Sequence, residues 1–136
     1  MPNEQNRVTI AGTAYHQLIG QNPFSVPLRG SMPLTSEEQV YSRTPPKGIG
    51  EAWELLDTGW LRGRCSIIYI RNEEPIGGPR IEIGKEGTEI GGLSIFPVPL
   101  CVPPGMVGVF YPIGSLAIRC EAGGSAARYT VYAIPE

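Results

Sequence analysis

The chain has 136 residues, a hydrophobic fraction of 41% and a charged fraction of 18%, which predicts one domain with room for its own core. Its net charge of −2 gives no basic surface for nucleic acid, so no nucleic-acid partner is expected. No membrane partner is expected either, because no apolar run reaches the roughly 18 residues of a spanning helix and the N-terminus lacks the features of a signal peptide.

Residues 1–49 are predicted to form an extended, proline-rich N-terminal arm. Residues 8–11 predict only a brief strand, and no period continues beyond them. Each proline removes an amide donor and biases the residue before it toward an extended backbone. Apolar residues scattered through the segment argue against a disordered linker. Two alternatives stay open: the arm binds another protein, or it packs on its own domain. The prolines are Pro23, Pro27, Pro33, Pro45 and Pro46.

Three apolar residues of the arm are candidate partner-binding residues. Phe24, Val26 and Leu28 alternate along the chain, so in an extended backbone they share one side. Such spacing suits strand addition to an exposed sheet edge. The single histidine, His16, is expected to be a surface or packing residue rather than a metal ligand or a general base.

Residues 50–136 alternate between short strand-like segments and turns, which predicts a β domain. The stretch 64–72 is the best central strand, because Ile67, Ile68 and Ile70 fall on both of its faces. Period-two segments follow at 80–84, 106–111, 115–120 and 127–134. The proline-rich stretch 97–105 cannot be a central strand. Six or seven strands at about ten-residue spacing favour an all-β fold, specifically an antiparallel, jelly-roll-like β-sandwich with no helix beyond two turns.

No motif for catalysis or for a cofactor occurs in the sequence, so no enzyme activity and no cofactor are expected. Glu73 and Glu74 are adjacent in a Pro/Gly loop, where they are expected to form a solvated loop tip rather than a catalytic pair. Gly77 and Gly78, with Arg80 nearby, are compatible with an anion cradle. A plain turn is the favoured interpretation of that loop.

Cys65, Cys101 and Cys120 are an odd number of cysteines at spacings that match neither a disulfide framework nor a zinc site. Each is flanked by apolar residues, so each is expected to be a buried, reduced thiol. This agrees with synthesis in a cytoplasm.

Two groups of side chains have both a structural and a partner-binding interpretation. Arg62, Arg64 and Arg71 flank the central strand and are candidates for contact with a carboxylate-rich partner, or are solvated strand ends. The aromatic residues are candidates for a sugar-stacking platform, or for core and interface positions. That aromatic group comprises Trp53, Trp60, Tyr69, Tyr111, Tyr129 and Tyr132.

The C-terminal two thirds resembles a family of phage proteins over roughly residues 52–135. The similar features are a Gly-Trp turn, the strand Ile-Tyr-Ile-Arg-Asn, the segment Ile-Glu-Ile-Gly and a Pro-Pro-Gly turn. After that turn come Ser-Leu-Ala-Ile-Arg-Cys, a Gly-Gly-Ser loop and Tyr-Thr-Val-Tyr-Ala-Ile. The pattern is similar to the capsid decoration, or cement, proteins of tailed bacteriophages and their β-sandwich relatives among head and tail accessory proteins.

This resemblance implies a virion structural protein, made in the host cytoplasm and located on the capsid surface. Its expected partners are the major capsid protein and other copies of itself, most simply as a trimer, with the arm holding neighbouring subunits. The low charge fraction also favours an oligomer, because it leaves apolar surface to cover. Two alternatives stay open: a tail- or fibre-associated carbohydrate- or receptor-binding module, and a cupin-like enzyme, which usually needs several histidines.

Overall fold

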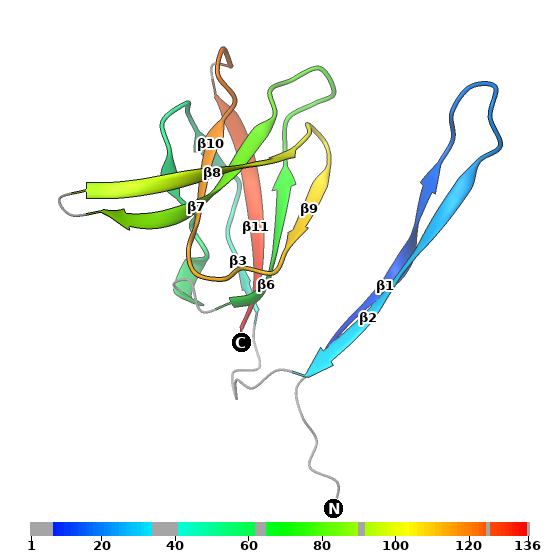
Figure 1. Cartoon of the computed structure of the whole chain (residues 1–136), viewed down its shortest axis with the longest axis horizontal. Coiled ribbons are helices and arrows are strands. Elements are labelled where there is room, and N and C mark those ends of the chain that lie inside the picture. Colours follow the sequence, from blue (N-terminus) through cyan, green and yellow to red (C-terminus); the bar gives the residue numbers. More distant parts are fainter. Residues whose placement is uncertain (1–6, 34–40, 62–64, 90–91, 125, 136) are drawn as a thin grey trace, which may run out of the picture. The chain divides into compact units, whose positions relative to one another are not determined.

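The computed structural model describes residues 7–33, 41–61, 65–89, 92–124 and 126–135. The described part is all-β: every strand pair is antiparallel, and its one helical element is the single 3-10 turn η1 (Gly59–Leu61). The chain divides into two compact units, residues 1–39 and 40–136, which are drawn in Figure 1. The first is called the hairpin unit here and the second the β domain.

The hairpin unit consists of two ten-residue strands, β1 (Arg7–His16) and β2 (Phe24–Pro33). They pair without a register shift from Arg7 opposite Pro33 to His16 opposite Phe24. The expectation of a brief strand within an otherwise irregular arm is therefore wrong. Both strands of a two-stranded hairpin are edges, where a proline without an amide donor is tolerated. Pro27 and Pro33 lie six positions apart on β2, so their nitrogens point to the same side of the strand.

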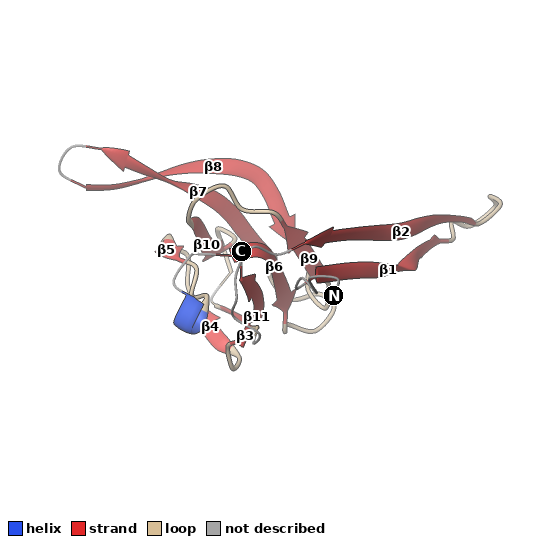
Figure 2. Ribbon diagram, turned by 90° about the horizontal axis from the view of Figure 1, so that it is seen from below, coloured by secondary structure: helices blue, strands red, loops and turns tan. Residues whose placement is uncertain are grey.

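The β domain contains two antiparallel sheets. Figure 1 shows β7 and β8 crossing the direction of β6 and β11, and Figure 2 shows β7 and β8 above β11 and β3. The four-stranded sheet has the order β5 (Glu54–Leu55), β10 (Leu116–Cys120), β7 (Ile81–Glu89), β8 (Gly92–Val102). The five-stranded sheet has the order β3 (Ser42–Arg43), β11 (Ala127–Pro135), β6 (Cys65–Asn72), β9 (Val107–Phe110), with β4 (Lys47–Ile49) also paired to β11.

Side chains from both sheets form one buried apolar cluster. The prediction of a central strand at 64–72 is confirmed, because β6 lies between β11 and β9 and Ile67 and Ile68 are both buried although they point to opposite faces. The edge position of residues 97–102 is confirmed too, since they belong to the outermost strand β8. The cluster includes Ile49, Leu61, Ile68, Ile70, Ile81, Ile83, Val102, Ile118, Tyr129 and Val131.

The division between the two units differs from the expected boundary at residue 49. Residues 42–49 pair with β11 through β3 and β4. Between these strands, the Thr44 N–H donates to the Val131 carbonyl at 3.0 Å, and the Val131 N–H donates to Thr44 Oγ1 at 3.1 Å. The buried threonine thus continues the hydrogen bonding to β11 between β3 and β4, where Pro45 and Pro46 have no amide donors. Residues 42–49 therefore belong to the β domain.

Candidate functional site

The hairpin unit has one apolar side and one polar side. The pairing of β1 with β2 places alternate residues of both strands on a common face. The opposite face carries Arg7, Thr9 and Ser31, which are joined by side-chain hydrogen bonds of 2.9 Å (Arg7 to Ser31) and 3.4 Å (Thr9 with Ser31). The first surface is called the apolar hairpin face and consists of Val8, Ile10, Ala14, Phe24, Val26, Leu28 and Met32.

The three residues predicted to share one side of the arm do share it, at consecutive alternate positions of β2. They remain exposed: 53% for Phe24, 41% for Val26 and 46% for Leu28. At the turn end of the face, the ring of His16 stacks on that of Phe24 with centroids 4.6 Å apart. That contact agrees with the packing role expected of the histidine. Arg62 and Arg64, the other two predicted partner-binding residues, lie outside the described residues.

A second exposed apolar surface lies on the side of the five-stranded sheet opposite the core. Tyr69 of β6 is opposite Tyr132 of β11 on one side and Val109 of β9 on the other. A hollow of about 360 Å³ opens there. This surface is called the tyrosine face, and it consists of Tyr41, Tyr69, Val107, Val109, Tyr132 and Ile134.

Cationic side chains border the tyrosine face. The Arg43 guanidinium lies 5.3 Å from the centre of the Tyr132 ring, a favourable cation–π distance. Arg71 Nε lies 3.6 Å from Glu73 Oε1. Burial, and secondarily the neighbouring Tyr111, raises the pKa of the Tyr69 phenol, so its hydroxyl stays protonated and able to donate a hydrogen bond at neutral pH.

The described members of the six aromatic residues considered as a platform do not lie together. Tyr69 and Tyr132 belong to the tyrosine face, whereas Tyr129 points into the core. The Arg119 guanidinium lies over the Trp53 ring, 4.4 Å from the centre of that ring. The side chain of Trp60 lies outside the described part. Tyr41 was missed because it was assigned to the arm. In the structure Tyr41 and Arg43 are exposed and only Ser42 between them is buried, an alternation that the residue types alone do not reveal.

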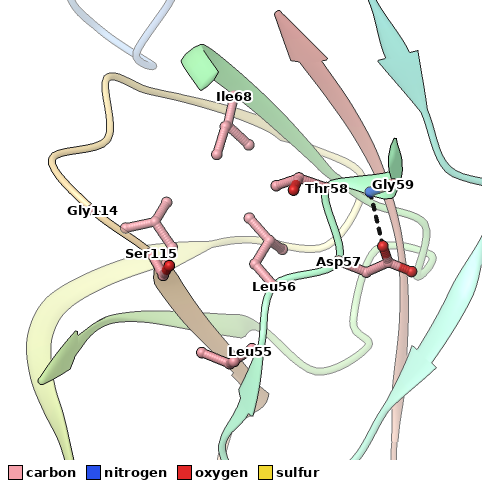
Figure 3. Close-up of a pocket in the computed structure, with 9 residues that line it drawn as sticks. Leu55, Leu56, Asp57, Thr58, Gly59, Ile68, Gly114 and Ser115 are labelled. Atoms are coloured by element: carbon pink, nitrogen blue, oxygen red, sulfur yellow. Dashed lines mark hydrogen bonds between the residues drawn. The ribbon is translucent and has the colours of Figure 1, made fainter. Parts of the chain in front are cut away.

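A second hollow, of about 300 Å³, lies between the segment 55–59 and the turn before β10. Figure 3 shows the Asp57 carboxylate directed away from the middle of this hollow. The carboxylate instead accepts a 2.8 Å hydrogen bond from the Gly59 N–H, an arrangement that holds a tight turn. No imidazole, thiol or amine occurs among the described residues that line it, which are Leu55, Leu56, Asp57, Thr58, Gly59, Ile68, Gly114, Ser115 and Leu116.

Tyr129 is the one described side chain with a fully buried polar atom that has no partner at good hydrogen-bond geometry, and the Asp57 backbone lies close to its hydroxyl. Only 1% of the residue is exposed. Burial, and secondarily the negative charge of Asp57, raises the pKa of this phenol to about 12. The neutral hydroxyl is therefore the form that the folded domain holds.

The carboxylates of the loop after β6 bind the neighbouring strand β11. Glu73 Oε1 accepts a 2.9 Å hydrogen bond from the Thr130 hydroxyl, and Glu74 Oε1 accepts one of 3.0 Å from the Arg128 N–H. Glu73 is exposed, as expected of a loop tip, whereas Glu74 is half-buried, and both carboxylates have partners in β11. Farther along, the Gly78 N–H donates to the Pro75 carbonyl at 2.9 Å, as in the plain turn that was favoured.

The remaining candidate groups are dispersed. Arg80 Nε donates to Glu121 Oε2 at 3.0 Å, so this cation is paired with a carboxylate. Cys65 and Cys120 are buried as expected. Cys101 is exposed, which corrects the expectation for it: it lies on edge strand β8 opposite Glu82, one position before the buried Val102. Within the described ranges, no group of three His, Cys, Asp or Glu residues could hold a metal ion.

Among the described residues, no helix has the length and apolar character needed to cross a membrane. Comparison of the chain with protein-family models, with curated proteins and with solved structures finds no match. The surfaces described above are therefore the basis for assigning a function.

Proposed function

We propose that the chain is a non-enzymatic structural protein of a tailed-phage virion, which binds the outside of the capsid and cements neighbouring subunits. In this proposal the β domain is a jelly-roll-like β-sandwich, and the hairpin unit is the arm that grips a neighbour. The observation that carries it is the exposed apolar hairpin face, together with the resemblance of residues 52–135 to decoration proteins. Asp57, Glu73 and Glu74 have structural roles.

The apolar hairpin face is the part of the molecule that gains most from a partner. A two-stranded hairpin is marginally stable in water unless something packs on it. Phe24, Val26 and Leu28 are each about half exposed, and covering the exposed half would contribute about 1 kcal/mol apiece. A protein that binds the assembled shell, but not dissociated subunits, stabilises the shell by mass action.

The test uses the full chain and a triple variant, Phe24→Ser with Val26→Thr and Leu28→Ser. Its matched control is Ser25→Ala with Arg29→Gln, on the opposite face of the same strand. All three proteins are sedimented with undecorated capsid shells. The triple variant is expected to bind about 100-fold more weakly, corresponding to roughly 3 kcal/mol, while the control binds as the unmodified chain does. Equal binding by all three proteins would remove the hairpin from the proposal.

A carbohydrate- or receptor-binding module is the second candidate function, and it rests on the tyrosines of the tyrosine face. Tyr41, Tyr69 and Tyr132 line one hollow, and tyrosine rings on a sheet face are suited to stacking on sugars. A glycan array probed with the full chain and with Tyr69→Ala tests it. Glycan binding that the substitution abolishes would favour this function over the structural one.

A further inference from the structure

Among the described residues, the hairpin unit and the β domain each expose an apolar surface, and the two surfaces differ in width. The hairpin unit is a narrow ribbon whose ten-residue strands span about 33 Å. The tyrosine face is broader, because it crosses β3, β11, β6 and β9, three strand spacings or about 14 Å. Tyr41, Val107 and Val109 are about half exposed within it. A ribbon laid on a sheet is the ordinary way in which two such apolar faces become buried.

The charges of the two surfaces are compatible with this packing. In the described hairpin, residues 7–33, the formally charged side chains are Arg7 and Arg29, and the register places both on the polar face. Arg43 and Arg71 border the tyrosine face, where Arg43 packs on Tyr132 and Arg71 pairs with Glu73. Covering the hollow with the apolar hairpin face therefore leaves each arginine at a rim, where it stays solvated.

The chemistry of the hollow favours a protein side chain over a sugar. Apart from Val107 and Ile134 its lining consists of three tyrosines, so the only side-chain polar atoms that it offers are phenol hydroxyls. A sugar needs several directed hydrogen bonds because each polar group that is buried without a partner costs free energy. The aliphatic side chains of the apolar hairpin face carry no such requirement.

Both surfaces belong to the same chain, so a second copy supplies an apolar hairpin face and a tyrosine face alike. The segment 34–40 joins the last hairpin residue, Pro33, to Tyr41, which itself lines the tyrosine face. A copy that accepts a hairpin on its tyrosine face therefore still has its own hairpin to donate. Repeating that contact gives a head-to-tail assembly, which closes into a ring when the rotation between copies permits.

We propose that the apolar hairpin face of one copy packs on the tyrosine face of the next. This inference deepens the proposed function and rests on it, because it identifies the neighbour that the arm grips as another copy. Each copy then acts once as donor and once as acceptor. The ring presents several identical domains to the shell, and this multivalency raises their apparent affinity.

The test uses one donor variant, Val26→Asp, and one acceptor variant, Val107→Asp, at positions where both side chains are about half exposed. Circular dichroism checks folding, and Val109→Asp replaces the acceptor variant if needed. Masses are measured by light scattering at about 50 μM. The unmodified chain is expected at a multiple of 14.7 kDa and each variant alone as a monomer. The mixture is expected at twice the chain mass, because one intact hairpin meets one intact face.

Other contacts give other results, so each outcome decides the question. An oligomer formed by the acceptor variant alone would indicate hairpin-to-hairpin packing, and one formed by the donor variant alone would indicate face-to-face packing. Either result, or a monomeric unmodified chain, would overturn the proposal. Controls are Ser25→Asp on the polar hairpin face and Ile76→Asp in the exposed loop before β7, both expected to keep the oligomer.

The outcomes also separate this inference from the proposed function. A chain that forms the head-to-tail oligomer but does not sediment with shells would support the contact between copies and refute the virion role. A monomer that binds shells through Val26 keeps the virion role and loses the contact. A monomer that binds a glycan, with the binding abolished by Tyr69→Ala, refutes the contact and assigns the tyrosine face to carbohydrate.

Discussion

Asn72 Nδ2 donates a 3.0 Å hydrogen bond to the carbonyl of Val102. Asn72 ends β6 in the five-stranded sheet and Val102 ends β8 in the four-stranded sheet, so this bond joins the two sheets. The same Nδ2 donates to the Pro79 carbonyl at 3.0 Å, and Oδ1 accepts from the Glu74 N–H at 3.0 Å. The side chain is fully buried, and its amide fixes the loop before β7 to both sheets.

Replacing Asn72 is expected to destabilise the β domain strongly. Asn72→Ala leaves two carbonyls and one N–H without their partner, which should lower the free energy of unfolding by about 3 kcal/mol. Asn72→Asp should be worse at pH 7, because a buried carboxylate would face two carbonyl oxygens. Urea unfolding followed by tryptophan fluorescence measures this, since both tryptophans lie in the β domain. An Asn72→Asp protein as stable as the unmodified chain would contradict the bridging role.

The buried phenol of Tyr129 predicts a loss of stability at high pH. Its pKa rises from 10.0 to about 12 on folding, so the unfolded chain releases this proton more readily than the folded one. The stabilisation is complete below pH 10 and is lost between pH 10 and 12. Tyr129→Phe should remove this pH-dependent loss of unfolding free energy, which is on the order of 2 kcal/mol between pH 10 and 12.

Urea titrations of the β domain at pH 8 and pH 11 check the Tyr129 prediction. The variant should lose less stability between these two pH values than the unmodified chain does. Tyr15→Phe, an exposed tyrosine of the separate hairpin unit, is the matched control. An identical loss in all three proteins would show that Tyr129 does not carry this pH dependence.

Gly59 and Gly114 both have left-handed backbones, and replacing Gly59 is predicted to destabilise the β domain more. The φ of Gly59 is 67° and that of Gly114 is 88°, a region costly for residues with a Cβ. A Cβ at Gly114 would meet open space, whereas one at Gly59 would collide with Ser42 Oγ. Gly114→Ala should cost about 1 kcal/mol and Gly59→Ala roughly 3 kcal/mol. Thermal melts that rank the two variants in the reverse order would contradict this geometry.

The cysteines should differ in their reactivity toward a thiol reagent. Cys101 is exposed, whereas Cys120 is buried, and burial raises the pKa of the Cys120 thiol. Native protein should therefore show a fast labelling phase that Cys101→Ser abolishes. Cys120 should react only when the domain opens, so Cys120→Ser should leave the fast phase unchanged. A fast phase that survives Cys101→Ser would contradict the assigned exposure.

Local patterns predicted strands, but they did not predict how strands far apart in sequence pair. Alternation in 127–134 and 115–120 found β11 and β10, and the isoleucines of 67–70 marked β6 as central. The strand β2 was not predicted because it contains Pro27 and Pro33. A proline is excluded only from strand positions whose amide must donate a hydrogen bond, and an edge strand has positions where it need not. The tyrosine face was not predicted as a unit, since its residues come from four sequence regions. Alternation did group Phe24, Val26 and Leu28, because they are neighbours on one strand.

The position of β11 determines when the β domain can form. This last strand pairs with β3, β4 and β6, so the five-stranded sheet is incomplete until residues 127–135 have left the ribosome. The hairpin unit needs only contacts within residues 7–33, and hairpins form in microseconds. During synthesis the two strands of the arm can therefore pair while the domain is still an open chain, and a polypeptide that stops before β11 would display an arm attached to a domain that cannot close.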